Sequence, residues 1–486
     1  MSAEKQKTAI WWIRRDLRLE HNQALNAAVK AGFCVIPLFI LDPYLLEGSR
    51  TGKQRMAFLY GGLQALEARI AQAGGRLILR SGPPEEVLGQ VQEEGGVEKI
   101  FAERDTSPYS RQRDQLVGSR LPLELVPGLT IAGPEEIKTN QGTPYQVYSY
   151  YRKKWKRKLL DGLRQDKAEV IKPAFSQAAL DSETLPREPE LKNSGLFPPG
   201  EGEARERLTN FVEGEGAPIY DYQVDRDRPD RDGTSRLSPY LHLGMIGTQE
   251  TFQAALRAVD RAGDQAQRQS AETWLDELIW REFYLSILYH HPRVKENNYR
   301  EEYNLIPWNN DEGDFQRWKE GRTGYPLVDA GMRQLSSIHW MHNRVRMITA
   351  SFLVKDLLVD WRWGEKWFME QLLDGDLAAN NGGWQWVAGT GTDAAPYFRI
   401  FNPTTQAEKH DPDGVYIRRY VPELRPVPDE HLHAPWKMPE DFQIEVGCVI
   451  GKDYPEPVID HAQARERTLE VYQVARQEYS EIKQDR

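Results

Sequence analysis

The residues from Asp374 to Trp386 bring acids, amides, glycines and indoles together in one short run. Their composition predicts the turn-rich start of a helix. The carboxamide of Asn380 can accept a hydrogen bond from one ring nitrogen and donate one to a neighbouring atom, and the two glycines that follow let backbone approach a planar ligand. Trp384 and Trp386 face different directions on a helix. The run therefore predicts a site for a polar ring cofactor beside a redox path.

A second set of candidate side chains follows a helical period. On a helix that begins near Thr273, residues Glu277, Trp280, Arg281 and Tyr284 share one face. In a pocket, the carboxylate could accept from base N–H groups and the indole could stack on a base. The alternative is an aromatic contact between helices with a Glu–Arg pair.

The run from Gly233 to Ser238 offers hydroxyls and an arginine just before a predicted helix. Free N–H groups at a helix start can bind a diphosphate. The same residues could instead form an ordinary Ser/Thr N-cap.

These runs closely resemble the photolyase/cryptochrome family. The Asp374–Trp386 run is similar to the flavin-binding core of that family. Further family patterns cover almost the whole chain, at Trp12–Arg18, Gly233–Pro239, Glu277–Tyr284, Trp340–Met347 and Gly389–Pro403. The resemblance is strongest to the class I cyclobutane pyrimidine dimer photolyases. It implies a Rossmann-like α/β domain followed by a larger helical domain that binds flavin adenine dinucleotide (FAD).

The resemblance also implies roles for individual residues near the flavin. Positions that match the family's FAD contacts are Tyr222, Thr234, Ser235, Arg236, Leu237, Ser238, Arg346, Asp374, Asp376 and Asn380. Arg346 and Asp374 match an ion pair beside the isoalloxazine ring; without the family they would be an ordinary salt bridge. Trp308, Trp361 and Trp384 match a chain that carries electrons from the surface to the flavin, although their spacing alone predicts only core positions.

The implied substrate is a flipped-out pyrimidine dimer in ultraviolet-damaged DNA. Residues that match its pocket are Glu277, Trp280, Arg281, Tyr284, Asn343, Met347 and Trp386, while Arg226 and Arg344 match DNA contacts. Photoexcited reduced FAD would donate an electron to the dimer, and the electron would return after the ring opens. Relatives that repair (6-4) photoproducts carry histidines where this chain has Asn343 and Met347, so that activity is disfavoured.

A cryptochrome-type blue-light photoreceptor is the alternative function from another class. Asn380 opposite flavin N5, the intact Trp280 and Trp386 pair and the lack of a long C-terminal extension favour repair. A nicotinamide oxidoreductase is a weaker alternative. Gly389–Ala394 fits G-x-G-x-x-A, but it follows a tryptophan-rich helical stretch instead of a strand. The histidine spacing predicts no metal site.

An antenna chromophore is also implied. Relatives that bind folate carry an Asn-Glu pair where this chain has Pro108–Arg111, so folate is disfavoured. Arg55 and Asp105 match positions near the site of 8-hydroxy-5-deazaflavin, which is therefore the predicted antenna.

Charge and composition limit the possible partners. The chain of 486 residues has a net charge of −10, yet Tyr150–Lys158 is a dense basic run with aromatics. That run could bind phosphate or form a solvated helix face. We expect the protein in the cytoplasm, because the N-terminus lacks a signal core and no apolar stretch could span a bilayer. We also expect a monomer. Cys34 and Cys448 are expected to be buried thiols.

Periodicity predicts the elements that position these residues. Residues 1–130 alternate strands and helices as a doubly wound parallel sheet does, with strands at Thr8–Ile13, Cys34–Leu41, Arg76–Arg80, Lys99–Ala102 and Leu123–Val126. Residues 131–202 lose periodicity and gain proline, glycine and charge, which predicts an interdomain connection. Residues 203–486 are predicted to be helical, with helices at Thr273–His290, Leu327–Leu358 and Lys366–Leu373.

Overall fold

The computed structural model describes residues 7–48, 50–165 and 172–485. Its contacts divide the chain into two compact units. Unit 1 comprises Met1–Tyr222, Ser235–Pro292 and Leu373–Ala378, and unit 2 comprises Gln223–Thr234, Arg293–Leu372 and Ala379–Arg486. This division follows contacts alone, so the domain boundaries at residues 130 and 202 stay predictions. Residues 1–6, on which the targeting expectation rests, lie outside the described part of the chain.

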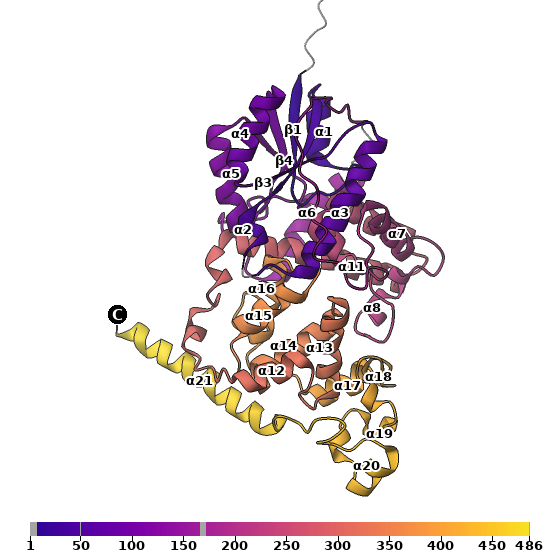
Figure 1. Ribbon diagram of the computed structural model, residues 1–486. Coiled ribbons are helices and arrows are strands. Elements are labelled where there is room, and N and C mark those ends of the chain that lie inside the picture. The colour runs from indigo at the N-terminus through magenta and orange to yellow at the C-terminus, as the bar shows by residue number, and fades with distance from the viewer. Residues whose placement is uncertain (1–6, 49, 166–171, 486) are drawn as a thin grey trace, which may run out of the picture. The chain divides into compact units, whose positions relative to one another are not determined.

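Unit 1 contains the predicted parallel sheet (Figure 1). Its five strands have the order β3-β2-β1-β4-β5. The bounds are Thr8–Ile13 for β1, Cys34–Leu41 for β2, Ile78–Ser81 for β3, Lys99–Glu103 for β4 and Leu123–Val126 for β5. The predicted bounds of β1, β2 and β5 are confirmed, while β3 begins at Ile78 instead of Arg76 and β4 ends at Glu103 instead of Ala102.

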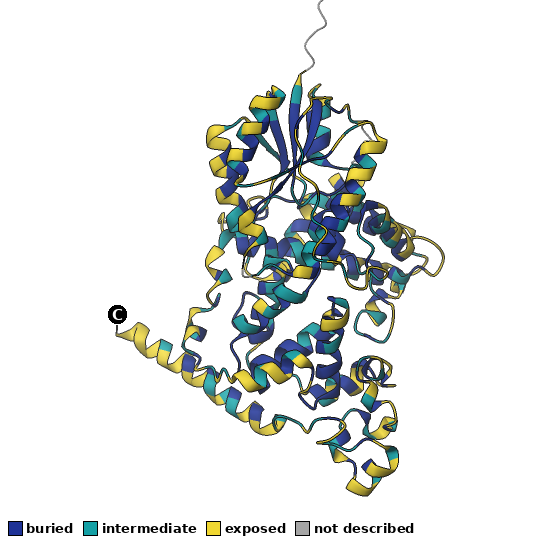
Figure 2. Ribbon diagram, viewed as in Figure 1, coloured by how far each residue is buried: buried dark blue, intermediate teal, exposed yellow. Residues whose placement is uncertain are grey.

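Helices cover both faces of the sheet, because parallel strands are apolar on each side. The flanking helices are α1 (Gln23–Lys30), α2 (Pro43–Leu46), α3 (Lys53–Gln72), α4 (Pro84–Gly95) and α5 (Pro108–Arg120). Side chains of α4 and α5 pack on one face, where Ile10, Ile36 and Ile100 are buried. Helices α1 and α3 lie on the other (Figure 1). All eight residues of β2 are buried, as the dark strands of Figure 2 show.

Strands β1 and β4 are neighbours although they are far apart in sequence. The strand order changes direction between them. Ligands of open α/β sheets bind at the carboxyl ends of such a strand pair. Arg14 and Arg15 follow β1 and Asp105 follows β4, so these charged residues stand where a ligand of such a sheet would bind.

The rest of unit 1 is helical. Its helices are α6 (Tyr148–Gln165), α7 (Glu201–Val212), η1 (Pro218–Tyr220), α9 (Ser238–Leu243), α10 (Thr248–Arg261) and α11 (Gln265–His290); α8 (Tyr222–Asp225) crosses into unit 2. Helix α6 lies inside the segment predicted as an interdomain connection. It forms because Tyr148, Tyr151 and Trp155 recur at helical spacing and are buried against α10 and α11, while Lys153 and Arg157 are exposed.

Unit 2 is built from helices, as predicted for this part of the chain. They are η2 (Pro292–Lys295), η3 (Glu301–Leu305), α12 (Glu312–Glu320), α13 (Pro326–Ile338), α14 (Asn343–Ser351), η4 (Phe352–Asp356), α15 (Trp361–Gln371), α16 (Leu377–Ala388), α17 (Pro403–His410), α18 (Val415–Tyr420), η5 (Pro422–Leu424), α19 (Asp429–Leu432), η6 (Pro435–Lys437), α20 (Glu440–Val446) and α21 (His461–Gln484). Helix α16 begins in unit 1.

The predicted helix Leu327–Leu358 is interrupted. Helix α13 ends at Ile338, and His339 adopts a left-handed conformation with φ of 55° before α14 begins at Asn343. The apolar period continues across the break, so the sequence pattern did not reveal it. The interruption places Asn343 and Arg344 at a helix start.

No helix in the described ranges is long and apolar enough to cross a bilayer. Cys34 and Cys448 are both buried free thiols, as expected.

Candidate functional site

An ionic cluster of largely buried side chains, which are 11–20% exposed, lies at the carboxyl ends of β1 and β4 in unit 1. We call Arg15, Asp105, His242 and Asp376 the Arg15 cluster. The Arg15 guanidinium contacts Asp376 through Nη2 at 2.7 Å and donates from Nε to the His242 carbonyl at 2.9 Å. Its Nη1 lies 3.9 Å from the Asp105 carboxylate. Arg15 therefore connects Asp105, predicted near an antenna, to Asp376, predicted at the flavin.

Burial and charge set the protonation of this cluster. Burial and the Arg15 charge lower the pKa of His242 to about 4, so its imidazole is neutral at physiological pH. Burial opposes ionisation of Asp105, but Arg15 and the Ser107 N–H outweigh it and lower the pKa of that carboxyl. The cluster thus combines ionised groups with a neutral imidazole whose Nδ1 lies 3.2 Å from Arg15 Nη2.

Arg55 lies in the electrostatic field of the predicted flavin carboxylates. Burial lowers the pKa of Arg55 to about 10, and the charges of Asp374 and Asp376 partly oppose that shift. Its Nη2 donates to the Arg50 carbonyl at 2.6 Å. Arg55 was predicted near an antenna, yet in unit 1 it senses the charges of Asp374 and Asp376, which were predicted at the flavin.

The space beside Asp105 is small. A cavity of about 10 Å³ is lined by Arg14, Arg15, Glu103, Arg104, Asp105 and Leu129. That volume is about one water molecule. A chromophore the size of a deazaflavin needs a pocket of roughly 300 Å³ or more.

The segment from Gly233 to Ser238 leads directly into the predicted helix, α9, whose first residue is Ser238. Arg236 has φ of 49°, a left-handed conformation that costs an L-residue about 1 kcal/mol and is concentrated at functional sites. Ser235 and Leu237 lie with Ser238 in unit 1, while Thr234 belongs to unit 2. Tyr222 is buried edge-on against Phe211, with ring centroids 6.0 Å apart.

Helix α11 confirms the predicted shared face. Glu277, Trp280, Arg281 and Tyr284 are all partly exposed, whereas the residues between them are mostly buried. The Trp280 ring stacks on Tyr148 of α6 with centroids 3.5 Å apart and planes 10° apart. Tyr284 lies 5.5 Å from Trp280. One face of the indole is therefore covered by protein, and a base could stack only on another part of this aromatic group.

Arg281, on the same face of α11, is held by a backbone carbonyl and senses the charges of the Arg15 cluster. Its Nη1 donates to the Leu129 carbonyl at 2.9 Å. Burial and the Arg15 charge lower its pKa, with Asp376 and Asp105 opposing the shift. Arg281 thus belongs electrostatically with the Arg15 cluster.

Sequence reasoning missed Glu282 as an anchor. This buried carboxylate accepts from Trp155 Nε1 at 2.6 Å and from the Ile131 N–H at 2.5 Å. Burial raises its pKa to about 7. Glu282 lies within the Glu277–Tyr284 run, and its spacing alone did not show that it is buried while Glu277 is partly exposed. It ties α6 and the segment around Ile131 to α11.

The start of α14 in unit 2 carries several predicted DNA and flavin residues. Arg346 Nε donates to the Met341 carbonyl at 2.8 Å. Asn343 is exposed, and its Nδ2 lies 3.9 Å from Met347 Sδ. Arg344 forms a two-pronged contact with Asp227. Its predicted neighbour Arg226 lies in the same segment as Asp227 and is partly exposed.

The predicted electron-transfer tryptophans share one hydrophobic core. Trp384 and Trp361 are buried in the core of unit 2, and Trp308 packs against it while partly exposed. The spacing of the three tryptophans did not show this. Trp361 donates from Nε1 to Asn298 Oδ1 at 2.7 Å. Trp386 is also partly exposed beside this core.

Trp384 is held by α15 and its neighbours. Its ring lies 5.0 Å from Phe368 and 6.1 Å from Trp318 between centroids, both edge-on. A Cβ at Gly364 would clash with the Trp384 ring, so this glycine permits the close approach. One helical turn before Trp384, Asn380 donates from Nδ2 to the Glu365 carbonyl at 2.9 Å. Its carbonyl oxygen could still accept from a ligand.

The basic face of α6 is partly ion-paired. Arg152 and Lys156 both contact Asp276 at 2.5 Å, and Lys158 lies 3.0 Å from Glu136. Lys153 and Arg157 are exposed. These contacts support an ion-paired helix face, while Lys153 and Arg157 leave positive charge exposed on it.

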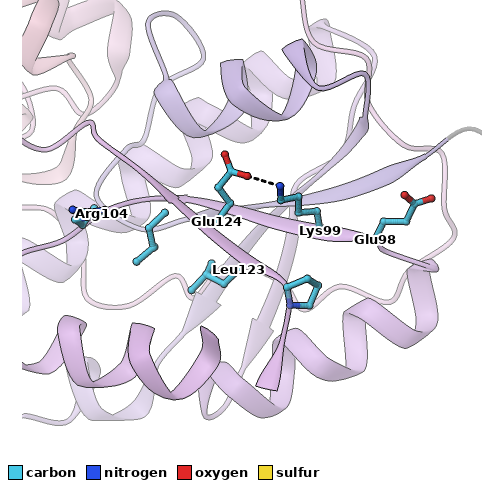
Figure 3. A pocket seen from close by; sticks show the side chains of 7 residues that line it. Glu98, Lys99, Arg104, Leu123 and Glu124 are labelled. Atoms are coloured by element: carbon cyan, nitrogen blue, oxygen red, sulfur yellow. Dashed lines mark ion pairs between the residues drawn. The ribbon is translucent and has the colours of Figure 1, made fainter. Parts of the chain in front are cut away.

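An open hollow of about 620 Å³ lies along β4 and β5 (Figure 3). Its floor carries the exposed ion pair between Lys99 and Glu124, at 2.5 Å. None of the predicted site residues lines it. The hollow is a feature of the sheet edge and does not belong to the candidate site.

Two family models match the chain. One, described as DNA photolyase, matches residues 9–173, and the other, described as the FAD binding domain of DNA photolyase, matches residues 274–474. The deoxyribodipyrimidine photo-lyase of Agrobacterium fabrum is 39% identical over 96% of this chain and 98% of its own length. The chain belongs to the photolyase/cryptochrome family. The deoxyribodipyrimidine photo-lyase of Escherichia coli is likewise 39% identical, over 96% of this chain and 99% of its own.

Solved structures of the family share the fold. A bacterial class III photolyase from Agrobacterium tumefaciens covers 98% of this chain and 99% of its own, with a TM-score of 0.89 and 37% identity. A cryptochrome from Synechocystis covers 97% of this chain and 100% of its own, with a TM-score of 0.83 and 28% identity. The combination of an α/β sheet with a helical FAD-binding domain is therefore confirmed. The similar structures include both a photolyase and a cryptochrome.

Proposed function

We propose that this protein repairs cyclobutane pyrimidine dimers in ultraviolet-damaged DNA, using light and reduced FAD. The observation that carries the proposal is full-length similarity to deoxyribodipyrimidine photo-lyases, at 39% identity over 96% of the chain. Within this family, the proposed subgroup is the class I enzymes, as the sequence motifs suggest; the similar class III structure makes that the alternative. The monomeric state and cytoplasmic location stay predictions.

The residues present fit FAD by their chemistry. Hydroxyls at Thr234, Ser235 and Ser238 next to the left-handed Arg236 suit a diphosphate. Asp374 and Asp376 offer carboxylates for ribose or ring donors, and Arg346 and Asn380 offer a cation and an amide for the ring. When bound, FAD would supply the light absorption and the electron that the repair reaction needs.

The protein would orient the flavin and control charge around it. Arg15 holds the Asp376 carboxylate at 2.7 Å, which fixes one proposed ligand of the cofactor. We assign Arg346 to stabilising negative charge on the ring, and Asp374 to balancing that cation. Asn380, with its amide nitrogen fixed on α15, would present its oxygen towards the ring.

We assign the α11 face to the dimer. Glu277 would accept from the N–H groups of the two pyrimidines, and Trp280 with Tyr284 would cover their apolar edges. Asn343, Met347 and Trp386 are the proposed pocket residues of unit 2, while Arg226 and Arg344 would contact phosphates. Arg281, whose guanidinium donates to Leu129, would act through the Arg15 cluster. Such a pocket excludes water while charge develops on the dimer.

Blue-light signalling of the cryptochrome type is the second candidate function. The Synechocystis cryptochrome structure, at 28% identity, favours it. The higher identity to photo-lyases and the Asn380 and Trp280 positions support repair instead.

We propose 8-hydroxy-5-deazaflavin as the antenna, from the match at Arg55 and Asp105. The residues around Asp105 and Arg55 fit this chromophore less well than the proposed flavin residues fit FAD. The cavity beside Asp105 is about 10 Å³, and Arg55 senses Asp374 and Asp376. We assign no step to an antenna. The absorption spectrum of protein purified from its native source tests the identity: a folate-like near-ultraviolet band, or no antenna band, contradicts it.

Replacing Glu277 by alanine tests the substrate assignment. The variant should bind a dimer-containing oligonucleotide about tenfold more weakly while retaining FAD, because a buried hydrogen bond to an ionised group contributes about 1.5–3 kcal/mol. Glu272→Ala is the matched control, since Glu272 is exposed on the same helix. Loss of FAD with unchanged dimer affinity would place Glu277 at the cofactor instead.

A further inference from the structure

The segment around Asp227 alternates acids and arginines. It reads Asp225-Arg-Asp-Arg-Pro-Asp-Arg-Asp232 and lies in unit 2 with α14. Its arginines contact its own carboxylates: Arg231 lies 2.6 Å from Asp225, and Arg228 contacts Asp230 at 2.7 and 2.8 Å. This segment therefore neutralises much of its positive charge within itself, although it carries the proposed DNA contact Arg226.

Asp227 extends the same pattern to Arg344. Arg344 Nη2 donates to both carboxylate oxygens of Asp227 at 2.7 Å, and its Nε donates to Oδ1 at 3.0 Å. The exposed fraction of the side chain is 18% for Arg344 and 38% for Asp227, so solvent reaches the pair. Burial opposes ionisation of Asp227, but Arg344 outweighs it and lowers the pKa of that carboxyl. The carboxylate is ionised in its contact with Arg344.

A DNA phosphate and a carboxylate compete for the same guanidinium donors. Both accept two parallel N–H bonds from an arginine. Phosphate can engage the Nε and Nη2 edge of Arg344 only if Asp227 leaves it. We propose that Asp227 is an internal competitor for DNA phosphate at Arg344, which weakens binding to undamaged DNA. The inference rests on the proposed function, because that function supplies the DNA.

Competition leaves a signature in the salt dependence of binding. A lysine or arginine that neutralises a phosphate releases about one condensed counterion. When Asp227 is displaced, its exposed carboxylate takes up a cation and cancels that release. Removing the carboxylate should therefore make the logarithm of affinity fall more steeply with the logarithm of salt, by about 0.9 per freed arginine.

The test compares Asp227→Asn with the unaltered protein on an undamaged duplex at several salt concentrations. We expect about three- to tenfold tighter binding near 0.1 M salt, since a partly exposed ion pair holds the arginine only modestly. The salt slope should steepen by about 0.9. Weaker binding would show that Asp227 only orients Arg344, and an unchanged slope would exclude competition.

Two controls isolate the pair. Asp413→Asn removes the same charge from unit 2 at a residue that is 76% exposed and lies 3.6 Å from Arg228, and it should not change the slope. Adding Arg344→Gln to Asp227→Asn should abolish the gain in affinity. Should Asp227→Asn fail to fold, Asp227→Ser takes its place: tighter binding with a steeper salt slope supports the proposal, and an unchanged slope overturns it.

The proposed function is tested separately in the same titration. If the unaltered protein binds a dimer-containing duplex no more tightly than an undamaged one, the repair proposal fails. The slope difference between Asp227→Asn and the unaltered protein on undamaged DNA does not depend on that result.

Discussion

Little of the Arg15 cluster of unit 1 or of the aromatic core around Trp384 in unit 2 is exposed, yet different forces stabilise them. Arg15 connects Asp105, His242 and Asp376 through directional charged contacts. Trp384 is held by ring contacts and by a glycine that makes room for it. Removing one partner from a charge cluster leaves the others uncompensated, whereas an aromatic core responds to volume. The proposed function uses the first region to fix the cofactor and the second to conduct electrons.

Replacing Arg15 by leucine should have the largest effect. Two largely buried carboxylates would lose their nearest cation, which costs up to about 3–5 kcal/mol of unfolding free energy. FAD content should fall as well, because Asp376 would lose its 2.7 Å partner. Urea denaturation and flavin absorbance measure the two effects.

The control for Arg15→Leu is Lys99→Leu. Lys99 pairs with Glu124 at the sheet edge, where the two side chains are 40% and 42% exposed. That change should cost less than about 1 kcal/mol. Equal losses in the two variants would contradict a special role for the buried cluster.

The same cluster predicts a dependence of stability on pH. The pKa of His242 is about 4 in the folded protein, against 6.5 for a free histidine. The unfolded chain therefore binds more protons in this window, so the free energy of unfolding should fall as pH decreases from 6.5 to 4. The contribution is on the order of 3 kcal/mol.

His242→Gln identifies this contribution. Urea midpoints between pH 4 and 7 should depend less on pH in the variant, since glutamine does not titrate. The groups that face His242 are Arg15, Arg55 and Asp376, and the variant retains all three. An unchanged pH profile would show that His242 is not the group responsible.

Gly364→Ala probes the aromatic region. The added methyl would meet the Trp384 ring, so overpacking should cost about 1–3 kcal/mol. The loss in urea midpoint should be the same at every pH between 4 and 7, whereas the contribution of His242 in the Arg15 cluster depends on pH. Gly383→Ala is the control, because a Cβ there meets no atom within 4 Å. A pH-dependent loss in Gly364→Ala would remove the contrast between the regions.

Trp384→Phe should have the smallest effect on stability, about 1 kcal/mol, because an aromatic ring still fills the core. Its effect on electron flow should be selective. Photoreduction of oxidised flavin should slow at least tenfold, while repair by chemically reduced enzyme continues. Transient absorption and a repair assay separate the two. Failure of repair in the reduced variant would give Trp384 a different role.

The sequence predicted regular elements better than it predicted their partners. The bounds of β1 and β2 were correct because continuous apolar runs mark buried parallel strands, and those of the partly buried β5 were also correct. Helix α6 fell in the predicted connection, since its basic face obscured the period of Tyr148, Tyr151 and Trp155. The break at His339 depends on one backbone angle, which composition does not report.

The candidate site divides in the same way. Residue types and family motifs proposed Asp376, Glu277 and Trp384 as site residues, and these roles stay predictions. They did not single out Arg15, His242 or Asp227. Arg15 and His242 contact Asp376, which lies 361 and 134 positions further along the chain. Asp227 contacts Arg344, 117 positions away. Long-range ion pairs leave no periodic signal, so only the folded structure reveals them.

The most direct test of the account is light-dependent loss of cyclobutane dimers from ultraviolet-irradiated oligothymidylate. The protein would be loaded with FAD, chemically reduced, and compared under blue light and in darkness. We predict that thymines are restored only in the light. Reduced, FAD-loaded protein that removes no dimers in the light would contradict repair and favour the photoreceptor function.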